Sequence, residues 1–381
     1  MLWIFGLMLA PIGVRLRWIL LGSLAFGGAG LHAAFELSGD LPSRRADGPV
    51  VVSREWLETR DSVLVATGKL ATGRFQVKVN SGPGLFTIRV GDSETSFVAG
   101  EGQALQVSEA ESGALLVAGG PDQKLYADYE MFRSESLGRL VLPVRAAGAA
   151  AQIAGNDAEV ARLTEAEVVG YRKHRHELND FTLERLRGSP ALYAAALRWD
   201  GDYRLEDLAK AVREFSERDP QAEIARLLEA RIARFRATAI GAIAPALAGA
   251  TPAGPAYALA ALRGRLVLVD FWASWCGPCR RENLHYVELY RKYHAAGFEI
   301  LAVSVDQDAA AWKAAIAKDG AIWRQVSDLT AWKSPLAAAY NVTALPASFL
   351  LDGEGRIVAK DLRGPALDAA LAERMGKLPV R

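Results

Sequence analysis

The chain of 381 residues has only two cysteines and five histidines. A structural zinc site needs about four ligands, and no second pair of cysteines or histidines at ligand spacing exists to complete one. The sequence therefore predicts no metal site. Neither sign of charge is in excess, since the chain has 45 Lys and Arg residues and 44 Asp and Glu residues. A net charge of +1 gives no reason to expect a nucleic-acid partner.

The two cysteines stand close together, in the segment Trp275–Cys279, with Gly277 and Pro278 between them. A two-residue spacer at the start of a helix holds two sulfur atoms close enough to bond. It also leaves Cys276 near the helix N-terminus, where the partial positive charge lowers the pKa of a thiol and favours the nucleophilic thiolate. The motif therefore predicts a protein that exchanges dithiols and disulfides.

The residues around the cysteines predict an α/β arrangement. Residues 265–273 form an apolar run of strand length, and residues 298–305 form a second one. Between them, apolar residues recur at helical spacing behind the cysteines: Leu284, Val287, Tyr290 and Tyr293. A strand, a helix and a second strand in this order imply a parallel crossover. The cysteines then lie at the carboxyl end of the first strand, where open α/β sheets place their chemistry.

These motifs carry a family resemblance. Residues 269–279 resemble the active-site stretch of the thioredoxin superfamily. Residues 297–306, 344–352 and 355–358 resemble its extracytoplasmic branch, the TlpA/ResA-like thiol:disulfide oxidoreductases. The likeness covers residues 238–381, which are therefore expected to form an α/β thioredoxin-like redox domain.

The resemblance implies a mechanism. Cys276 is expected to be the exposed nucleophile that attacks a substrate disulfide, and the more buried Cys279 then resolves the mixed disulfide. Pro278 suits the first turn of the helix, where its missing N–H is no loss. A Gly-Pro spacer resembles the reducing members of the superfamily, so we expect the reductase direction. No cofactor is expected besides the cysteine pair.

Two acidic residues match family positions. Asp270 lies six residues before Cys276, where thioredoxin has a buried carboxylate, and burial raises the pKa of such a group. Asp270 could then accept the proton of Cys279, and an acid in an apolar run is costly without such a purpose. Glu282 lies six residues after Cys276, where ResA-like proteins have a functional glutamate. The alternative for Glu282 is a solvated helix residue, and which acid dominates stays open.

The resemblance also predicts a substrate contact. Pro346 matches the cis-proline of the superfamily, so the Leu345–Pro346 bond is expected to be cis and to present main-chain groups of Ala344 to an extended substrate. Trp272 is expected in the core, and Trp275 at the surface near the thiol. The expected substrate-binding residues are Trp275, Gly277, Pro278, Ala344, Leu345 and Pro346.

The N-terminus has the features of a signal peptide. Arg15 and Arg17 precede a short apolar run at residues 18–26, and small residues lead to a plausible cleavage site after Ala33. We therefore expect residues 1–33 to be a signal peptide and the protein to act in the periplasm, where disulfide chemistry is common. The alternative is an uncleaved signal that anchors the chain in the membrane.

Residues 34–150 predict a β-rich accessory domain. Short strand-like runs alternate with Gly, Asp and Ser at intervals typical of an antiparallel sandwich or barrel. The runs are residues 62–66, 75–79, 85–90 and 114–118. Residues 68–75 resemble part of the small β-domain that precedes the thioredoxin domain in long TlpA-like proteins. A spacer or docking platform is expected there.

Residues 151–237 predict a helical connector. His174 and His176 lie in it among basic residues. Residues at i and i+2 do not share a helix face, so we expect a solvated helical surface and no metal site.

Two other functions stay open. A peroxiredoxin-like peroxidase shares the fold, but it needs a threonine two or three residues before a lone cysteine, and Ser274 is the nearest hydroxyl here. A non-enzymatic envelope binding protein with an auxiliary redox domain is the second alternative. For the favoured reductase, the expected partners are disulfide-containing envelope proteins, with apocytochrome c among the candidates, and a membrane-embedded electron donor.

Overall fold

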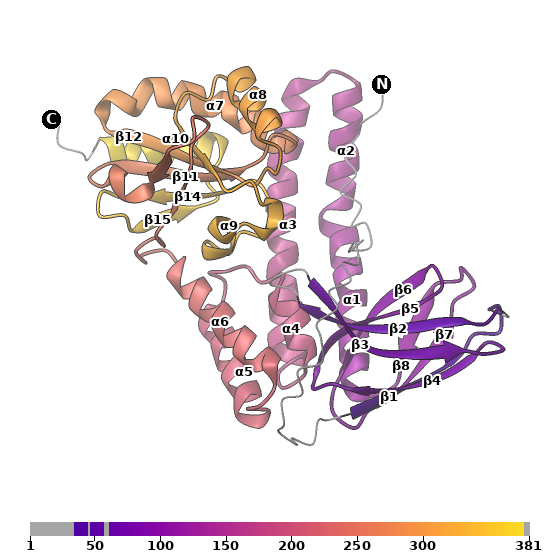
Figure 1. The fold of residues 1–381 in the computed structure, drawn as a ribbon. Helices are drawn as coiled ribbons and strands as arrows, with labels where there is room; N and C mark the ends of the chain where they lie inside the picture. The colour runs from indigo at the N-terminus through magenta and orange to yellow at the C-terminus, as the bar shows by residue number, and fades with distance from the viewer. Residues whose placement is uncertain (1–33, 45, 57–60, 377–381) are drawn as a thin grey trace. The chain divides into compact units, whose positions relative to one another are not determined.

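The computed structural model describes residues 34–44, 46–56 and 61–376. The chain divides into two compact units, Met1–Ala230 and Arg231–Arg381 (Figure 1). The predicted signal peptide, residues 1–33, lies outside the described residues. Within the described part of the chain, no helix is both long enough and apolar enough to cross a membrane.

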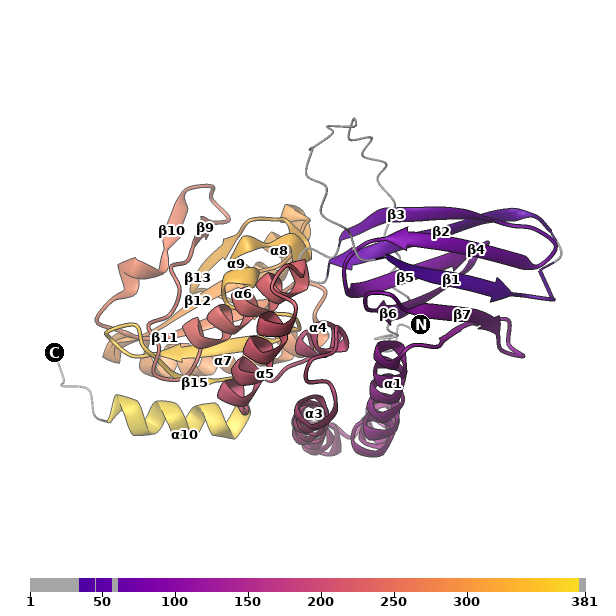
Figure 2. The ribbon, with the colours of Figure 1, turned by 90° about the horizontal axis from the view of Figure 1, so that it is seen from below.

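The first unit begins with two four-stranded sheets, as the sequence predicts for this region (Figure 2). The strand orders are β4-β1-β7-β8 and β3-β2-β5-β6, and every pairing is antiparallel except β1 with β7. The strands are β1 (Ala34–Asp40), β2 (Gly48–Trp56), β3 (Asp61–Leu70), β4 (Arg74–Asn80), β5 (Gly84–Val90), β6 (Ser93–Ala99), β7 (Ala104–Glu109) and β8 (Leu115–Ala118).

Alternating burial shows why these runs form sheets around one core. In β4, Phe75, Val77 and Val79 are buried and the residues between them are exposed, which is the two-residue period of a strand with one covered face. Buried side chains from both sheets form a common cluster. Phe35 and Phe86 belong to this cluster, with ring centroids 4.8 Å apart.

Helices follow the sheets and begin at Pro121, within the range predicted to be β-rich. They are α1 (Pro121–Leu140), α2 (Leu142–Ile153), α3 (Asp157–Arg185), α4 (Ala191–Ala196), α5 (Leu205–Arg218) and α6 (Glu223–Ala237). The division into an accessory domain, a connector and a redox domain therefore stays a prediction, and its first boundary lies inside a helical segment.

The expected solvated surface around His174 and His176 is wrong. His174 is 4% exposed, and its Nδ1 lies 2.9 Å from the Oγ of Ser136 on α1. His176 is half-buried and stacks on Tyr203, with ring centroids 3.8 Å apart. The reason is tertiary: α3 packs against α1 and α2, so its polar sequence does not face water on every side. Burial lowers the pKa of His174 to about 4.

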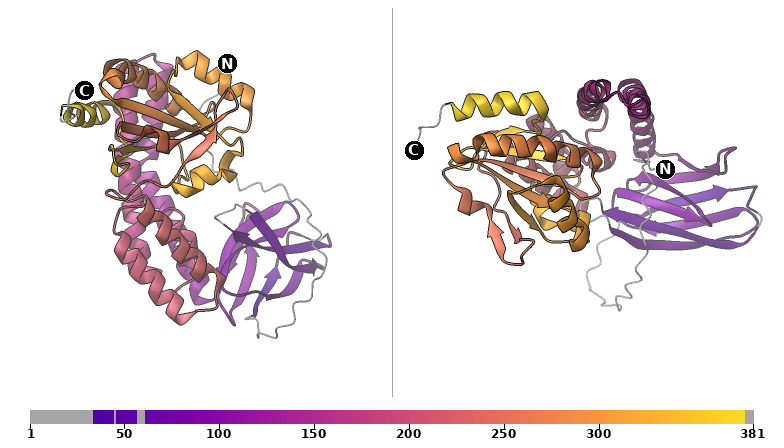
Figure 3. Two further views of the ribbon diagram at one scale, coloured as in Figure 1. Left: turned by 60° about the vertical axis from the view of Figure 1, so that its left-hand side comes forward. Right: turned by 90° about the horizontal axis from the view of Figure 1, so that it is seen from above.

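The second unit is built on a seven-stranded sheet with the order β10-β9-β13-β12-β11-β14-β15 (Figure 3). Its strands are β9 (Ala248–Ala250), β10 (Ala256–Ala258), β11 (Leu266–Trp272), β12 (Phe298–Ser304), β13 (Arg324–Ser327), β14 (Ala347–Leu351) and β15 (Ile357–Lys360). Its helices are α7 (Gly277–Tyr293), α8 (Ala309–Asp319), α9 (Pro335–Ala339) and α10 (Gly364–Met375). This is the predicted thioredoxin-like fold.

The central strand places the cysteines. All seven residues of β11 are buried, and β11 pairs in parallel with β12 and antiparallel with β14. The chain leaves β11 at its carboxyl end and enters α7, which packs against β12, α8 and α10. The predicted crossover of strand, cysteine helix and strand is confirmed.

Candidate active site

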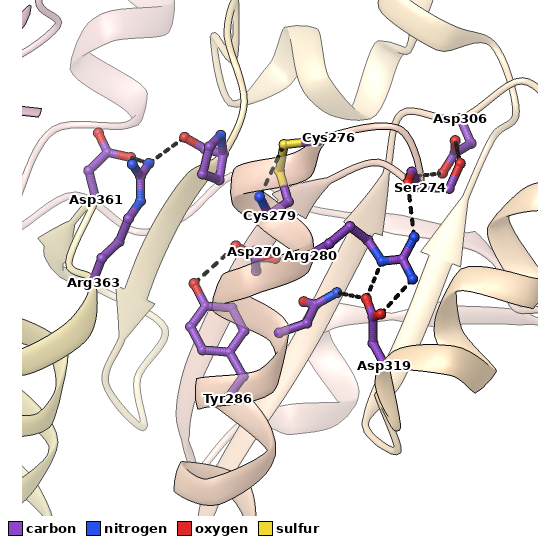
Figure 4. Close-up of a disulfide and its surroundings, with 12 residues drawn as sticks. Asp270, Ser274, Cys276, Cys279, Arg280, Tyr286, Asp306, Asp319, Asp361 and Arg363 are labelled. Atoms are coloured by element: carbon purple, nitrogen blue, oxygen red, sulfur yellow. Dashed lines mark hydrogen bonds and ion pairs between the residues drawn. A yellow bond between two sulfur atoms is a disulfide. The ribbon is translucent and has the colours of Figure 1, made fainter. Parts of the chain in front are cut away.

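Cys276 and Cys279 form a disulfide at the N-terminus of α7 (Figure 4). Cys276 is the N-cap residue, and its Sγ accepts a hydrogen bond from the N–H of Cys279 at 3.3 Å. The helix N-terminus favours negative charge at this sulfur, which suits Cys276 to act as a thiolate once the disulfide is reduced.

The two cysteines differ little in exposure. Cys276 is 6% exposed and Cys279 is 2% exposed. The expectation that Cys276 is exposed is therefore wrong for this oxidised form, because the disulfide holds its sulfur against the first turn of α7. The expected order, with Cys279 the more buried, is confirmed.

The expected substrate-contact residues are more open. Trp275 is 59% exposed, and its ring centroid lies 6.3 Å from that of Trp332. Gly277 and Ala344 are exposed, whereas Pro278, Leu345 and Pro346 are half-buried. The Leu345–Pro346 peptide bond is cis, as predicted. Trp272 is fully buried, which confirms its predicted place in the core.

Asp270 lies in the middle of β11 and is 2% exposed. The one hydrogen bond described for its carboxyl group comes from the hydroxyl of Tyr286, which donates to Oδ1 at 3.3 Å (Figure 4). Burial raises the pKa of Asp270 to about 7, although the positive charge of Arg363 opposes this change. A carboxyl group with such a pKa can both accept and release a proton near neutral pH.

Glu282 lies on α7, and its side chain is 18% exposed. Its Oε1 accepts the N–H of Gly364 at 3.2 Å and lies 3.3 Å from Nδ1 of His285. The solvated-helix alternative therefore does not describe this residue. The negative charge of Glu282 is one of the influences that raise the pKa of Asp270, so one predicted acid acts on the other.

His285 is a site residue that the sequence reasoning missed. Its Nε2 lies 2.9 Å from Oδ1 of Asp368 on α10, and its other ring nitrogen faces Glu282. The hydrogen bond to Glu282 is the main cause that raises the pKa of His285. The spacing of three residues between Glu282 and His285 places them on one helix face. That spacing was the only sequence signal, because Asp368 lies far along the chain.

A second polar group flanks α7 (Figure 4). Arg280 donates two hydrogen bonds to the carboxylate of Asp319 and a third to the carbonyl oxygen of Ser274 at 3.1 Å. Asn283 Nδ2 donates to Asp319 at 2.9 Å. Asp306 accepts from the N–H and the hydroxyl of Ser274 at 2.9 and 2.6 Å. These bonds fix the loop that leads into the cysteines.

The fold and the site together define a class of protein. A cysteine pair that forms a disulfide at a helix N-terminus, on a thioredoxin-like sheet, is suited to dithiol–disulfide exchange. The same domain contains Asp270, a buried carboxyl group with a pKa of about 7.

Comparison with known proteins gives the same class. A family model described as Redoxin matches residues 238–370. The thiol-disulfide oxidoreductase ResA of Geobacillus kaustophilus is 35% identical over 121 residues, which are 32% of this chain and 68% of the relative. ResA of Bacillus subtilis is 32% identical over 100 residues, 26% of this chain and 54% of the relative. The chain belongs to the ResA-like thiol-disulfide oxidoreductases, and its second unit is a thioredoxin-like oxidoreductase domain.

A solved structure also matches. The thioredoxin domain of a thiol-disulfide oxidoreductase from Bacteroides vulgatus is 35% identical, with a TM-score of 0.35, and the match covers 36% of this chain and 98% of that one. The Redoxin match begins at residue 238, so the β-sheets and helices of the first unit lie outside it.

Proposed function

We propose that the protein is an extracytoplasmic reductase of protein disulfides that works through a Cys276–Cys279 cycle. The observation that carries the proposal is the disulfide at the N-terminus of α7, in the same domain as a buried carboxyl group with a pKa of about 7. The helix terminus favours a thiolate on Cys276, and Asp270 can accept the proton that Cys279 must lose.

In the reduced enzyme, the thiolate of Cys276 attacks one sulfur of a substrate disulfide. The substrate S–S bond breaks, one substrate thiolate leaves, and a mixed disulfide forms on Cys276. Cys279 then passes its proton to Asp270 and attacks the sulfur of Cys276. The mixed disulfide breaks, the second substrate thiolate leaves, and the Cys276–Cys279 disulfide forms. Two electrons have passed from the enzyme to the substrate, and a dithiol donor must return them.

The direction, place and partners rest on sequence features. The Gly277-Pro278 spacer resembles that of reducing thioredoxins and supports reduction. The basic and apolar segments within residues 1–33 support export to the periplasm. Candidate substrates are disulfide-containing envelope proteins, apocytochrome c among them, and the candidate donor is a membrane-embedded carrier of reducing equivalents. Residues 34–237 are proposed to be accessory to the redox domain.

The test uses the full chain in its reduced form. We expect it to reduce insulin disulfides, Cys276→Ser to be inactive, and Cys279→Ala to accumulate a mixed disulfide on Cys276. Undiminished insulin reduction by Cys276→Ser would contradict the cycle. Consumption of hydrogen peroxide in preference to insulin would instead favour the peroxidase alternative.

The site of action has its own test. N-terminal sequencing of exported protein should find Ala34 at or near the first position. A membrane-bound product that still carries residues 1–33 would establish the anchor alternative.

A further inference from the structure

Arg363 makes contacts that the cycle above does not use. It immediately precedes α10, and its guanidinium donates to the carbonyl oxygen of Pro346, the proline of the cis peptide bond. Its Nη2 also lies 4.0 Å from Oδ1 of Asp361 (Figure 4). The side chain is only 24% exposed, so its charge is partly withdrawn from solvent.

The same segment reaches the strand beside Asp270. Ser348 of β14 lies opposite Asp270 of β11 in the antiparallel register. The N–H of Ser348 donates to Oδ1 of Asp361 at 3.1 Å, and the N–H of Asp361 donates back to the carbonyl oxygen of Ser348 at 2.8 Å. Arg363 thus contacts the cis-proline loop directly, and it is linked through Asp361 to the strand next to the buried acid.

The charged and titratable groups that act on Asp270 come from two sides of it. Tyr286 and Glu282 lie on α7, and Asp361 and Arg363 lie in the segment before α10. Arg363 is the only cation among them, and after burial it is the largest influence on the pKa of Asp270, which it lowers. Arg363 also lowers the pKa of Tyr286, the hydrogen-bond donor to Asp270.

We propose that Arg363 is a positioning residue of the redox reaction, which holds the carbonyl of Pro346 and lies beside Asp361, whose hydrogen bonds to Ser348 reach the strand paired with that of Asp270. It thereby links the loop expected to bind substrate to the group expected to accept the proton of Cys279. This inference rests on the proposed function. Arg363 touches no reacting atom and acts through Pro346 and Asp270.

The sign of the expected effect follows from electrostatics. A positive charge favours the carboxylate form of a nearby acid. Without Arg363, the pKa of Asp270 should rise further, because less opposes the effect of burial. Fewer Asp270 side chains are then carboxylates at pH 7, and fewer can accept a proton. The attack by Cys279 should slow at pH 7 and recover at higher pH, whereas the attack by Cys276 should keep its pH dependence.

Ellman's reagent, an aromatic disulfide that releases a coloured thiolate at each of the two attacks, separates these steps in the reduced full chain. In Arg363→Met we expect the pH midpoint of the second release to rise by about half a unit or more. Arg363→Lys retains the charge and should stay near the wild-type midpoint. Arg291→Met is the matched control, because it removes an exposed arginine from the last turn of α7.

A double variant separates this role from a structural one. If Arg363 acts through Asp270, Arg363→Met should not move the midpoint in an Asp270→Asn background. A shift that persists in that background, or an unchanged midpoint in Arg363→Met alone, would overturn the inference. If Arg363→Met does not fold, Arg363→Gln against Arg363→Lys gives the same comparison. Failure of the wild-type chain to show a second release would contradict the proposed cycle instead, so the two failures are distinguishable.

Discussion

Two buried carboxyl groups lie on either side of α7 and differ in how many hydrogen bonds they receive (Figure 4). On one side, Asp319 is 8% exposed and receives hydrogen bonds from Arg280 and from Asn283. On the other side, Asp270 is 2% exposed, and among the described residues the one hydrogen bond to its carboxyl group comes from Tyr286, at 3.3 Å. The same helix therefore borders a fully partnered carboxylate and a nearly unpartnered one.

The difference shows how a fold separates structure from chemistry. A carboxylate that binds a guanidinium and an amide has its charge compensated, and removing one partner of such a pair is strongly destabilising. For Asp270, the charge of Arg363 and the hydrogen bond from Tyr286 compensate burial only in part, so burial dominates and raises its pKa to about 7. A group that is costly to keep charged is poorly suited to stabilise a core, but it suits proton transfer at neutral pH.

The largest expected effect comes from neutralising Asp270. In Asp270→Asn, the attack of Cys279 on the mixed disulfide should slow by about 10²–10⁴-fold, because an amide cannot accept the proton. The attack of Cys276 on substrate should remain nearly intact. Stopped-flow tryptophan fluorescence can follow both steps. If Asp270→Asn resolves its mixed disulfide at the normal rate while Glu282→Gln does not, the glutamate is the dominant acid.

Substitution of Asp319, the acid with several hydrogen-bond donors, should change stability and leave the resolving step intact. Asp319→Ala removes one member of a largely buried ion pair, and Arg280 and Asn283 lose the carboxylate that accepts their hydrogen bonds, so the free energy of unfolding should fall by roughly 3 kcal/mol. The pH midpoint of the resolving step should not move. Urea unfolding and the pH profile measure the two quantities. A midpoint shift without loss of stability would show that this side of α7 also takes part in the chemistry.

The sequence predicted those parts of the site that local pattern determines. The cysteine motif, the apolar run around Asp270 and the helical spacing behind the cysteines are all short-range signals, and each led to the correct element. The cis bond before Pro346 was expected from a family resemblance that also rests on a short motif.

The rest depends on contacts between distant parts of the chain. Arg280 and Asp319 lie 39 residues apart, and His285 and Asp368 lie 83 apart, so neither pair leaves a periodic signal. His174 also shows that local sequence does not determine burial. Its basic neighbours suggested that the side chain is exposed to solvent, but packing of α3 on α1 buries the ring. Exposure of Cys276 could not be read from the motif either, because it depends on the oxidised geometry.

Glu282→Gln sharpens the comparison by changing the surroundings of Asp270 without touching it. The negative charge of Glu282 helps to raise the pKa of Asp270, so its removal should lower the pH midpoint of the resolving step by roughly a few tenths of a unit. Glutamine can still accept the N–H of Gly364. The expected direction is opposite to that of Arg363→Met, and a shift to higher pH would contradict this account of Glu282.

The smallest effect should come from His285, which joins α7 to α10 through Asp368. Its pKa is raised above the ordinary 6.5. The protonated ring therefore contributes stability that is fully present below about pH 6.5 and is lost as the pH rises through the folded-state pKa. The side chain is 24% exposed and that of Asp368 is 51% exposed, so solvent screening should limit the contribution to about 0.5 kcal/mol.

In urea unfolding, the stability difference between wild type and His285→Gln should be present in mildly acidic buffer and should disappear in mildly alkaline buffer. Asp368→Asn is the matched control on α10. It should remove part of the same pH-dependent stability without changing the N-terminus of α7, where the cysteines lie. Because Glu282 keeps its bond to Gly364 in both variants, the resolving step should change less than it does in Glu282→Gln. A stability difference that grows as the pH rises would mean that the neutral ring, rather than the imidazolium, joins the two helices.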